Sequence, residues 1–195
     1  PRQSHLEAIG GACRRNCRIY LKAVYVCGTD TDVGKSVLSA LLLRHLQHQG
    51  TPARYLKPIQ TGPDSDTAMV QNLAEIPEQR IAPPVVSLPR PASVDQAAAN
   101  AGVHVILHEV RKSLVKMMAG TPDDVWVLEA AGGLRVPLND EEEQVDLIQS
   151  VGTPVILANR SGLGTLNHTL LTVEALERSR IPLHGVVMFG EPHPE

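Results

Sequence analysis

Cysteine is scarce in this chain, and long apolar runs are missing from it. The cysteines are Cys13, Cys17 and Cys27, an odd and sparse set that does not indicate a disulfide framework and favours a reducing, cytoplasmic compartment. No apolar run approaches the roughly 20 residues that a membrane-spanning helix needs, so we expect no membrane partner. Positive charge is not in excess either. The net charge of −3 does not favour non-specific binding to nucleic acid.

What remains is the composition of a globular protein. A length of 195 residues with 43% hydrophobic residues is enough for one domain with a sizeable core. Residues 1–21 differ from the rest, because they are basic, show no periodicity and lack the apolar core of a secretory signal. We therefore expect a disordered extension over residues 1–21, with Cys13 and Cys17 as free thiols rather than metal ligands, before a single domain over residues 22–195.

The segment Gly28-Thr-Asp-Thr-Asp-Val-Gly-Lys-Ser36 carries the strongest signal. It follows an apolar run and precedes a helical pattern, which is the context of a loop that cradles phosphates. Lys35 would neutralise the β- and γ-phosphates, and the Ser36 hydroxyl would help to hold Mg²⁺. Five residues (29–33) separate the two glycines where the usual pattern has four. The acidic Asp30 and Asp32 favour a loop that meets Mg²⁺, water or a cationic substrate.

Predicted strands and helices alternate after residue 22. Hydrophobic patterning predicts strands over Ala23–Cys27, Ala53–Lys57, Asp124–Leu128, Pro154–Ala158 and Leu183–Phe189. It predicts helices over Val37–Gln49, Ser65–Glu75, Val94–Asn100, Val103–Met118, Gln144–Ser150 and Leu166–Arg180. The proline-rich stretch 76–92 is expected to be loop. This order predicts an α/β fold with a parallel sheet covered by helices on both faces.

Polar side chains stand where the predicted strands end, which is where such sheets bind ligands. Lys57 ends the second strand, and a second lysine beside the phosphate loop suits the transfer of a phosphoryl group. Glu129 ends the third strand, where an acid linked to Mg²⁺ is common. Asp66 is a second acid near the start of a helix, where by itself it would only cap the helix.

Four of these segments together resemble the dethiobiotin synthetase family. They are Gly28–Ser36, Lys57-Pro-Ile-Gln-Thr61, Glu129-Ala-Ala-Gly-Gly133 and Gly162-Leu-Gly-Thr-Leu-Asn-His168, and the resemblance spans residues 22–190. It implies a three-layer α/β/α fold of the P-loop NTPase type. It also implies a ligase of biotin biosynthesis that uses ATP and Mg²⁺. The enzyme would join 7,8-diaminononanoate and CO₂ through a carbamate and a carbamic-phosphoric anhydride, closing the ureido ring of dethiobiotin.

The resemblance also implies roles for individual residues. Lys35, Lys57 and Thr31 would be catalytic, and Ser36, Asp66 and Glu129 would hold Mg²⁺. ATP would contact Gly28, Thr29, Asp30, Thr31, Asp32, Val33, Gly34, Lys35, Ser36 and Glu129. The carbamate or the diamine would contact Thr31, Lys57 and Thr61. In a homodimer with sites at its interface, Leu163, Gly164 and Asn167 would receive the substrate carboxylate in the partner's site.

The chain departs from the family pattern at two informative positions. Ala130 stands where the family more often has glycine, a costly change if the position needs a positive φ. Phe189 stands where the family usually has an asparagine that contacts adenine. Since relatives continue further, we expect the domain to be truncated at its C-terminus. Two alternative functions stay open at this point: an ATP-dependent dimerisation switch of the ParA/MinD type and an inactive truncated homologue.

Overall fold

The computed structural model describes residues 22–63 and 65–190. A parallel sheet of five strands runs through its centre in the order β2-β5-β1-β6-β7. The strands are β1 (Ala23–Gly28), β2 (Ala53–Leu56), β5 (Val125–Gly133), β6 (Val155–Arg160) and β7 (Leu183–Phe189). The predictions for residues 1–21 and for Cys13 and Cys17 lie outside the described residues.

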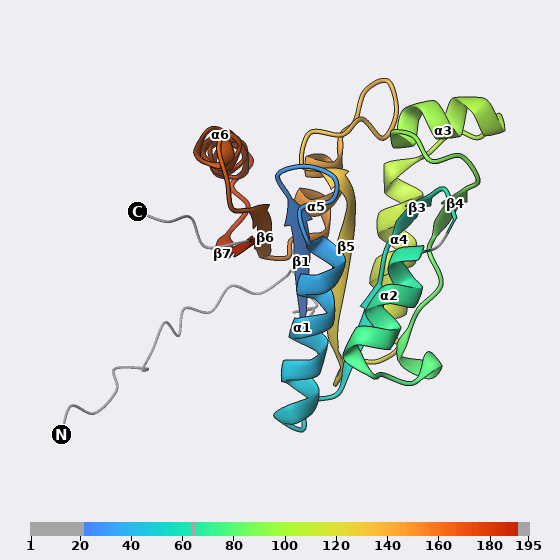
Figure 1. Cartoon of the computed structure of the whole chain (residues 1–195). Helices are drawn as coiled ribbons and strands as arrows, with labels where there is room; N and C mark the ends of the chain where they lie inside the picture. The colour runs from blue at the N-terminus through green and yellow to red at the C-terminus, as the bar shows by residue number, and fades with distance from the viewer. Residues whose placement is uncertain (1–21, 64, 191–195) are drawn as a thin grey trace, which may run out of the picture.

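Helices cover both faces of this sheet, as predicted (Figure 1). One face packs against α1 (Lys35–His48) and α2 (Ser65–Ala74), whose apolar side chains form one buried cluster. The other face packs against α4 (Leu107–Ala119), α5 (Gln144–Val151) and α6 (Thr165–Arg178), and a second buried cluster joins these helices with α3 (Val94–Ala101). The architecture is a three-layer α/β/α fold. No helix within the described ranges is long and apolar enough to cross a membrane.

The alternation of side chains along the central strands explains why two clusters form. On β1, Tyr25 and Cys27 join the cluster below α4 and α5, whereas Val26 joins the cluster below α1. Neighbouring residues of a strand point to opposite faces of a sheet, so a strand covered by helices on both sides must be apolar throughout. The sequence Ala23-Val-Tyr-Val-Cys27 meets this requirement.

The stretch 76–92 is more ordered than the sequence predicts. It contains a 3₁₀ turn, η1 (Glu78–Arg80), and a short strand, β4 (Val86–Leu88). Strand β4 pairs in parallel with β3 (Ile59–Thr61), a strand that was also not predicted. Prolines flank β4 at positions 84 and 89, and prolines are tolerated at strand ends because they interrupt no hydrogen bond within the ladder. The rest of the segment is loop, as expected, and the prediction missed these short elements.

Two predicted boundaries also shift by more than two residues. Helix α4 begins at Leu107 instead of Val103, and β5 runs on to Gly133 instead of ending at Leu128. The extension of β5 carries Glu129 inside the strand, where it pairs in register with Val26 of β1. The carboxylate is thus positioned by a central strand with neighbours on both sides, which holds a side chain more firmly than a loop does.

Candidate active site

The phosphate-type loop connects β1 to α1, and two of its positions accept only glycine. A Cβ atom on Gly28 would lie 2.7 Å from Cγ2 of Val33 and 2.8 Å from the Asp30 carbonyl oxygen. Gly34 has a φ of +96°, and a Cβ atom there would lie 2.6 Å from Cδ2 of Phe189. The loop is therefore packed tightly against β7 at its end and against its own residues at its start.

Lys35 begins α1 and points back under the loop. Its Nζ donates a hydrogen bond of 2.7 Å to the carbonyl oxygen of Asp30. The side chain is buried, and burial lowers the pKa of Lys35 below its usual range, against the opposing attraction of the Glu129 carboxylate. The ammonium group lies at the N-terminus of a helix, where backbone N–H groups already favour anions.

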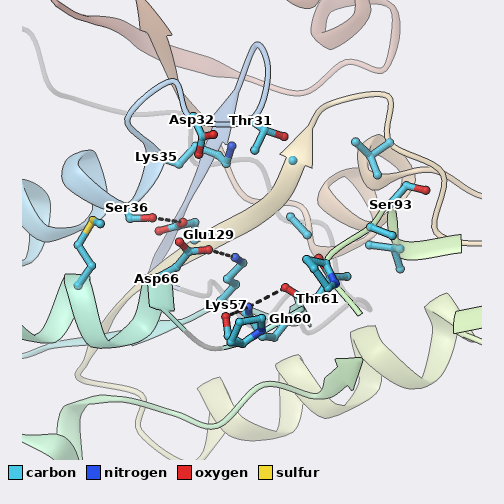
Figure 2. Close-up of a pocket in the computed structure, with 18 of the residues that line it drawn as sticks. Thr31, Asp32, Lys35, Ser36, Lys57, Gln60, Thr61, Asp66, Ser93 and Glu129 are labelled. Carbon is cyan, nitrogen blue, oxygen red and sulfur yellow. Dashed lines mark hydrogen bonds and ion pairs between the residues drawn. The ribbon is translucent and has the colours of Figure 1, made fainter. Parts of the chain in front are cut away.

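Glu129 is the most buried acid of the site, with 1% of its surface exposed. Its Oε1 accepts a hydrogen bond from the hydroxyl of Ser36 (2.8 Å) (Figure 2). Its Oε2 accepts hydrogen bonds from the hydroxyls of Ser39 (2.7 Å) and Tyr55 (3.1 Å). Burial raises the pKa of Glu129 above its usual range, and the serine hydroxyls oppose this change because they stabilise the ionised form.

Lys57 forms an ion pair with Oδ2 of Asp66, across the pocket from the loop (Figure 2). The lysine follows β2 and is 8% exposed, whereas Asp66 lies in the first turn of α2. The structure therefore brings together the two charged residues that the sequence placed on separate segments. Asp66 is paired with Lys57 and also lines the same cavity as Ser36 and Glu129, the residues with which it was predicted to hold a cation.

These groups line one cavity of about 790 Å³. Its walls come from the phosphate loop, the segment around β3, the start of α2, the segment before α3 and the end of β5. The residues that line it are Thr31, Asp32, Gly34, Lys35, Ser36, Val37, Lys57, Gln60, Thr61, Pro63, Asp66, Met69, Pro91, Ala92, Ser93, Val94, Glu129, Ala131, Gly132 and Val136. The volume is in the range of sites that hold a drug-sized ligand.

Most of the predicted site residues meet in this cavity, but not all. Gly28, Thr29 and Asp30 of the loop are not part of its lining, and Val33 is turned into the core. Leu163, Gly164 and Asn167 lie at the start of α6, and among the described residues none of the cavity's lining comes from that helix. Gln60, Met69 and Ser93 also line the cavity and were not predicted. The pairing of β3 with β4 brings together the segments of Gln60 and Ser93, whereas Met69 comes from α2.

The outer side of the phosphate loop faces β6 and α6. The hydroxyl of Thr29 donates to Oδ1 of the buried Asn159 (3.0 Å), whose Nδ2 donates in turn to the hydroxyl of Thr169 on α6. Asp30 lies 3.8 Å from Nη2 of Arg160, and both side chains are about half exposed. The loop is thus attached to the β6–α6 segment by a buried amide and by a loose surface ion pair.

The two departures from the family pattern now have physical explanations. Ala130 lies within β5, is fully buried in the core, and is not among the described residues with a positive φ. Its methyl group is therefore accommodated, and the cost considered for a positive φ does not arise. The Phe189 ring packs against Gly34, so it covers the end of the phosphate loop and offers no hydrogen-bonding group there.

The donor atoms around Ser36 and Glu129 suit a hard cation. Both supply oxygen, which Mg²⁺ prefers, and they adjoin the position where phosphates would lie. Within the described part of the chain, no group of three or more His, Cys, Asp or Glu side chains could hold a metal ion by itself. Ser36 and Glu129 are therefore candidates to hold a cation together with the phosphates of a bound nucleotide.

Comparison with known families gives a consistent result. Residues 22–195 match a family model described as an AAA domain. An ATP-dependent dethiobiotin synthetase of Paramagnetospirillum magneticum is 41% identical over 174 residues, which cover 89% of this chain and 79% of the relative. One from Rhodopseudomonas palustris is 42% identical over 172 residues, with 87% and 77% covered. A bifunctional biotin biosynthesis protein of Bordetella avium is 42% identical over 174 residues, covering 88% of this chain and 35% of the relative.

Solved structures agree on the fold. The kinase domain of the Escherichia coli tyrosine kinase ETK superposes with a TM-score of 0.55 at 11% identity, covering 87% of this chain and 68% of that domain. The BceF tyrosine kinase domain gives a TM-score of 0.51 at 19% identity, with 88% and 69% covered. At such low identity the likeness supports the three-layer architecture alone.

Proposed function

Since this chain belongs to the family of ATP-dependent dethiobiotin synthetases, it is a ligase of biotin biosynthesis, and we propose that the cavity beside the phosphate loop is where it closes the ureido ring. Its substrates are 7,8-diaminononanoate, CO₂ and ATP. The observation that carries the proposal is that Lys35 and Lys57 line a cavity that also contains the oxygens of Ser36 and Glu129. Two cations and a set of oxygen donors fit an anionic carbamate and the phosphates of ATP.

The reaction proceeds in three steps. One amine of the diamine bonds to the carbon of CO₂ and loses a proton, which gives a carbamate. A carbamate oxygen bonds to the γ-phosphorus as the bond to ADP breaks, which gives the mixed anhydride. The second amine attacks the carbonyl carbon, inorganic phosphate leaves with the electrons of the C–O bond, and the ring closes with loss of a proton.

In this reaction Lys57 binds the carbamate. In the structure it is paired with Asp66, so its ammonium group is held inside the cavity before substrate arrives. An anionic carbamate competes with Asp66 for this cation, and the released carboxylate then faces the cation site. Thr31 and Thr61, which line the same cavity, donate hydrogen bonds to the carbamate or its diamine.

Lys35 and Glu129 act on the nucleotide side. Lys35 exchanges the Asp30 carbonyl for the β- and γ-phosphates and stabilises the charge that develops during transfer. Ser36, Glu129 and Asp66 hold Mg²⁺ together with the phosphates. When bound, the ion neutralises phosphate charge. The oxygen donors of Ser36 and Glu129 support this assignment.

A homodimer completes the proposal. Four leucines of the α6 region are exposed by more than half of their surface: Leu163, Leu166, Leu170 and Leu171. Such a cluster is typical of a protein–protein contact. The contact presents Leu163, Gly164 and Asn167 to the carboxylate of the substrate in the partner's site. Light scattering should report a dimer that Leu170→Glu dissociates, whereas Leu41→Glu, at an exposed leucine of α1, should leave it intact.

The cytoplasm is the proposed compartment. Cys27, the one cysteine among the described residues, is a buried free thiol, which suits a reducing environment.

The proposed reaction is tested by measuring ADP release with MgATP and bicarbonate, with and without 7,8-diaminononanoate. We expect release that depends on the diamine, together with formation of dethiobiotin detected by mass spectrometry. Steady ADP release without the diamine would instead indicate an ATPase switch, and absence of release in both cases would indicate an inactive homologue.

A further inference from the structure

The two oxygens of the Glu129 carboxylate are held from different directions. Oε1 accepts from Ser36, which lines the cavity. Oε2 accepts from Ser39 and Tyr55, which are both fully buried and are not part of the cavity lining. One oxygen therefore belongs to the cavity, whereas the other is fastened to the core.

The fold brings these two core donors to Glu129 from separate elements. Ser39 lies one turn after Lys35 on α1, among the apolar residues that this helix buries against the sheet. Tyr55 lies on β2, opposite Val127 of β5, so its side chain projects from the same face of the sheet as Glu129 two residues further along β5. Both residues share the apolar layer between α1 and the sheet.

The hydroxyls of Ser39 and Tyr55 are polar groups in an otherwise apolar layer. A hydroxyl buried at either position is costly unless it is hydrogen-bonded, and an alanine or a phenylalanine would fill nearly the same space without that requirement. Both hydroxyls are directed at a single carboxylate oxygen. Two donors on one oxygen hold the plane of the carboxylate and occupy the lone pairs of that oxygen.

We propose that Ser39 and Tyr55 are positioning residues that keep Oε2 of Glu129 occupied on the core side, so that Oε1 is the oxygen offered to a divalent cation in the cavity. This inference rests on the proposed function, in which Glu129 helps to hold Mg²⁺. A carboxylate restricted to one oxygen suits the strict octahedral geometry of Mg²⁺, whereas Ca²⁺ accepts carboxylates through both oxygens. Ser39 and Tyr55 thus also favour Mg²⁺ over Ca²⁺.

The variants Ser39→Ala and Tyr55→Phe each remove one hydroxyl and leave the apolar part of the side chain in place. The probe is Mn²⁺, whose free concentration is followed by electron paramagnetic resonance in the presence of protein and a non-hydrolysable ATP analogue. Competition with Mg²⁺ and with Ca²⁺ gives the affinities of the two diamagnetic ions. We expect about 10-fold weaker Mn²⁺ binding in each single variant and about 100-fold in the double variant, with a lower ratio of Mg²⁺ to Ca²⁺ affinity.

Tyr25→Phe is the matched control. Tyr25 is also fully buried, but its hydroxyl accepts a hydrogen bond from Gln144 (3.3 Å), and the residue belongs to the cluster on the other face of the sheet. This variant should lose a phenol hydroxyl without any change in cation affinity. Thermal unfolding is measured for every variant to check that it is folded. If Tyr55→Phe does not fold, the cation affinity of Ser39→Ala decides the test.

Glu129→Gln separates the cation role of Glu129 from the positioning role of Ser39 and Tyr55. If it weakens Mn²⁺ binding strongly while the double variant binds as the unmodified protein does, Glu129 holds the cation but the positioning role of Ser39 and Tyr55 is wrong. If Glu129→Gln leaves Mn²⁺ binding unchanged, the cation role of Glu129 is wrong, and the positioning role falls with it.

Discussion

On the β5 side of the phosphate loop Lys35, Lys57 and Glu129 are buried, whereas on the β6 side the charged side chains reach solvent. Glu129 and Lys57 are 1% and 8% exposed, and each makes an ion pair or accepts several hydrogen bonds. Arg160 and Asp30 are about half exposed and 3.8 Å apart. Charges interact strongly where water is excluded and weakly where it is not. The chemistry should therefore depend on the β5 side.

The largest effect should follow the loss of a cation on the β5 side. Lys35→Ala removes the ammonium group that faces the phosphates, so we expect diamine-dependent ADP release to fall by about a thousand-fold or more. Lys112→Ala provides the control, because Lys112 is exposed on α4 and pairs with Glu109 of the same helix. Turnover of Lys35→Ala close to that of the control would remove Lys35 from the phosphate site.

The second-largest effect should follow a substitution at Gly34, where the phosphate loop packs against Phe189 of β7. Gly34→Ala places a methyl group 2.6 Å from Phe189 at a φ of +96°, so strain and overlap add. We expect a loss of about 2–5 kcal/mol in the free energy of unfolding, measured with urea. Gly50→Ala has a positive φ but open space around it, so only about 1–2 kcal/mol should be lost. Equal losses in the two variants would show that the contact with Phe189 is not restrictive.

Asn159 is the buried polar residue on the otherwise solvent-exposed β6 side of the loop. Asn159→Ala leaves the Thr29 hydroxyl without its acceptor and unties the loop from α6. We expect the protein to lose about 1–3 kcal/mol of stability, since two hydrogen bonds of a buried amide disappear and each is worth about 0.5–1.5 kcal/mol. Asn100→Ala, at an exposed position on α3, should change stability by less than about 0.5 kcal/mol. If Asn159→Ala does not change the free energy of unfolding, water replaces its hydrogen bonds at no cost, and the contact does not hold the loop.

The smallest effect should come from the surface ion pair. Arg160→Ala breaks the contact with Asp30 while both side chains are already solvated. We expect less than about 1 kcal/mol of stability to be lost, and any change in the apparent affinity for ATP to fade at high salt. A large loss that persists in high salt would contradict the comparison, because it would mean that Arg160 contributes to the site as strongly as the buried residues do.

The phosphate loop, the alternation of strands and helices, and the three-layer fold could be predicted from the sequence. Their signals are local: glycines at a set spacing, apolar runs, and helical periodicity around them. The strand ends identified Lys57 and Glu129 for the same reason. Strands β3 and β4 could not be predicted, because each is only three residues long and exists through pairing with the other.

The roles of single residues depended more on tertiary structure. Sequence alone suggested Asp66 as a cation ligand or a helix cap, and the fold pairs it with Lys57. The sequence suggested that the backbone at Ala130 could be strained by a positive φ. Because β5 extends through Ala130, the residue has strand backbone and is buried in the core. Ser39 and Tyr55 gave no signal beyond a polar residue on a buried helix face and a tyrosine in a strand.

By itself, the sequence determined that one loop has the pattern of a phosphate cradle and which family the chain belongs to. Both properties depend on contiguous residues, and a short run of residues sets its own backbone conformation. Only the tertiary structure decided which acid faces which base, which oxygen of Glu129 faces the cavity, and that α6 lies apart from it. Those relations depend on distances between residues far apart in the chain, and such distances are set by strand order and packing.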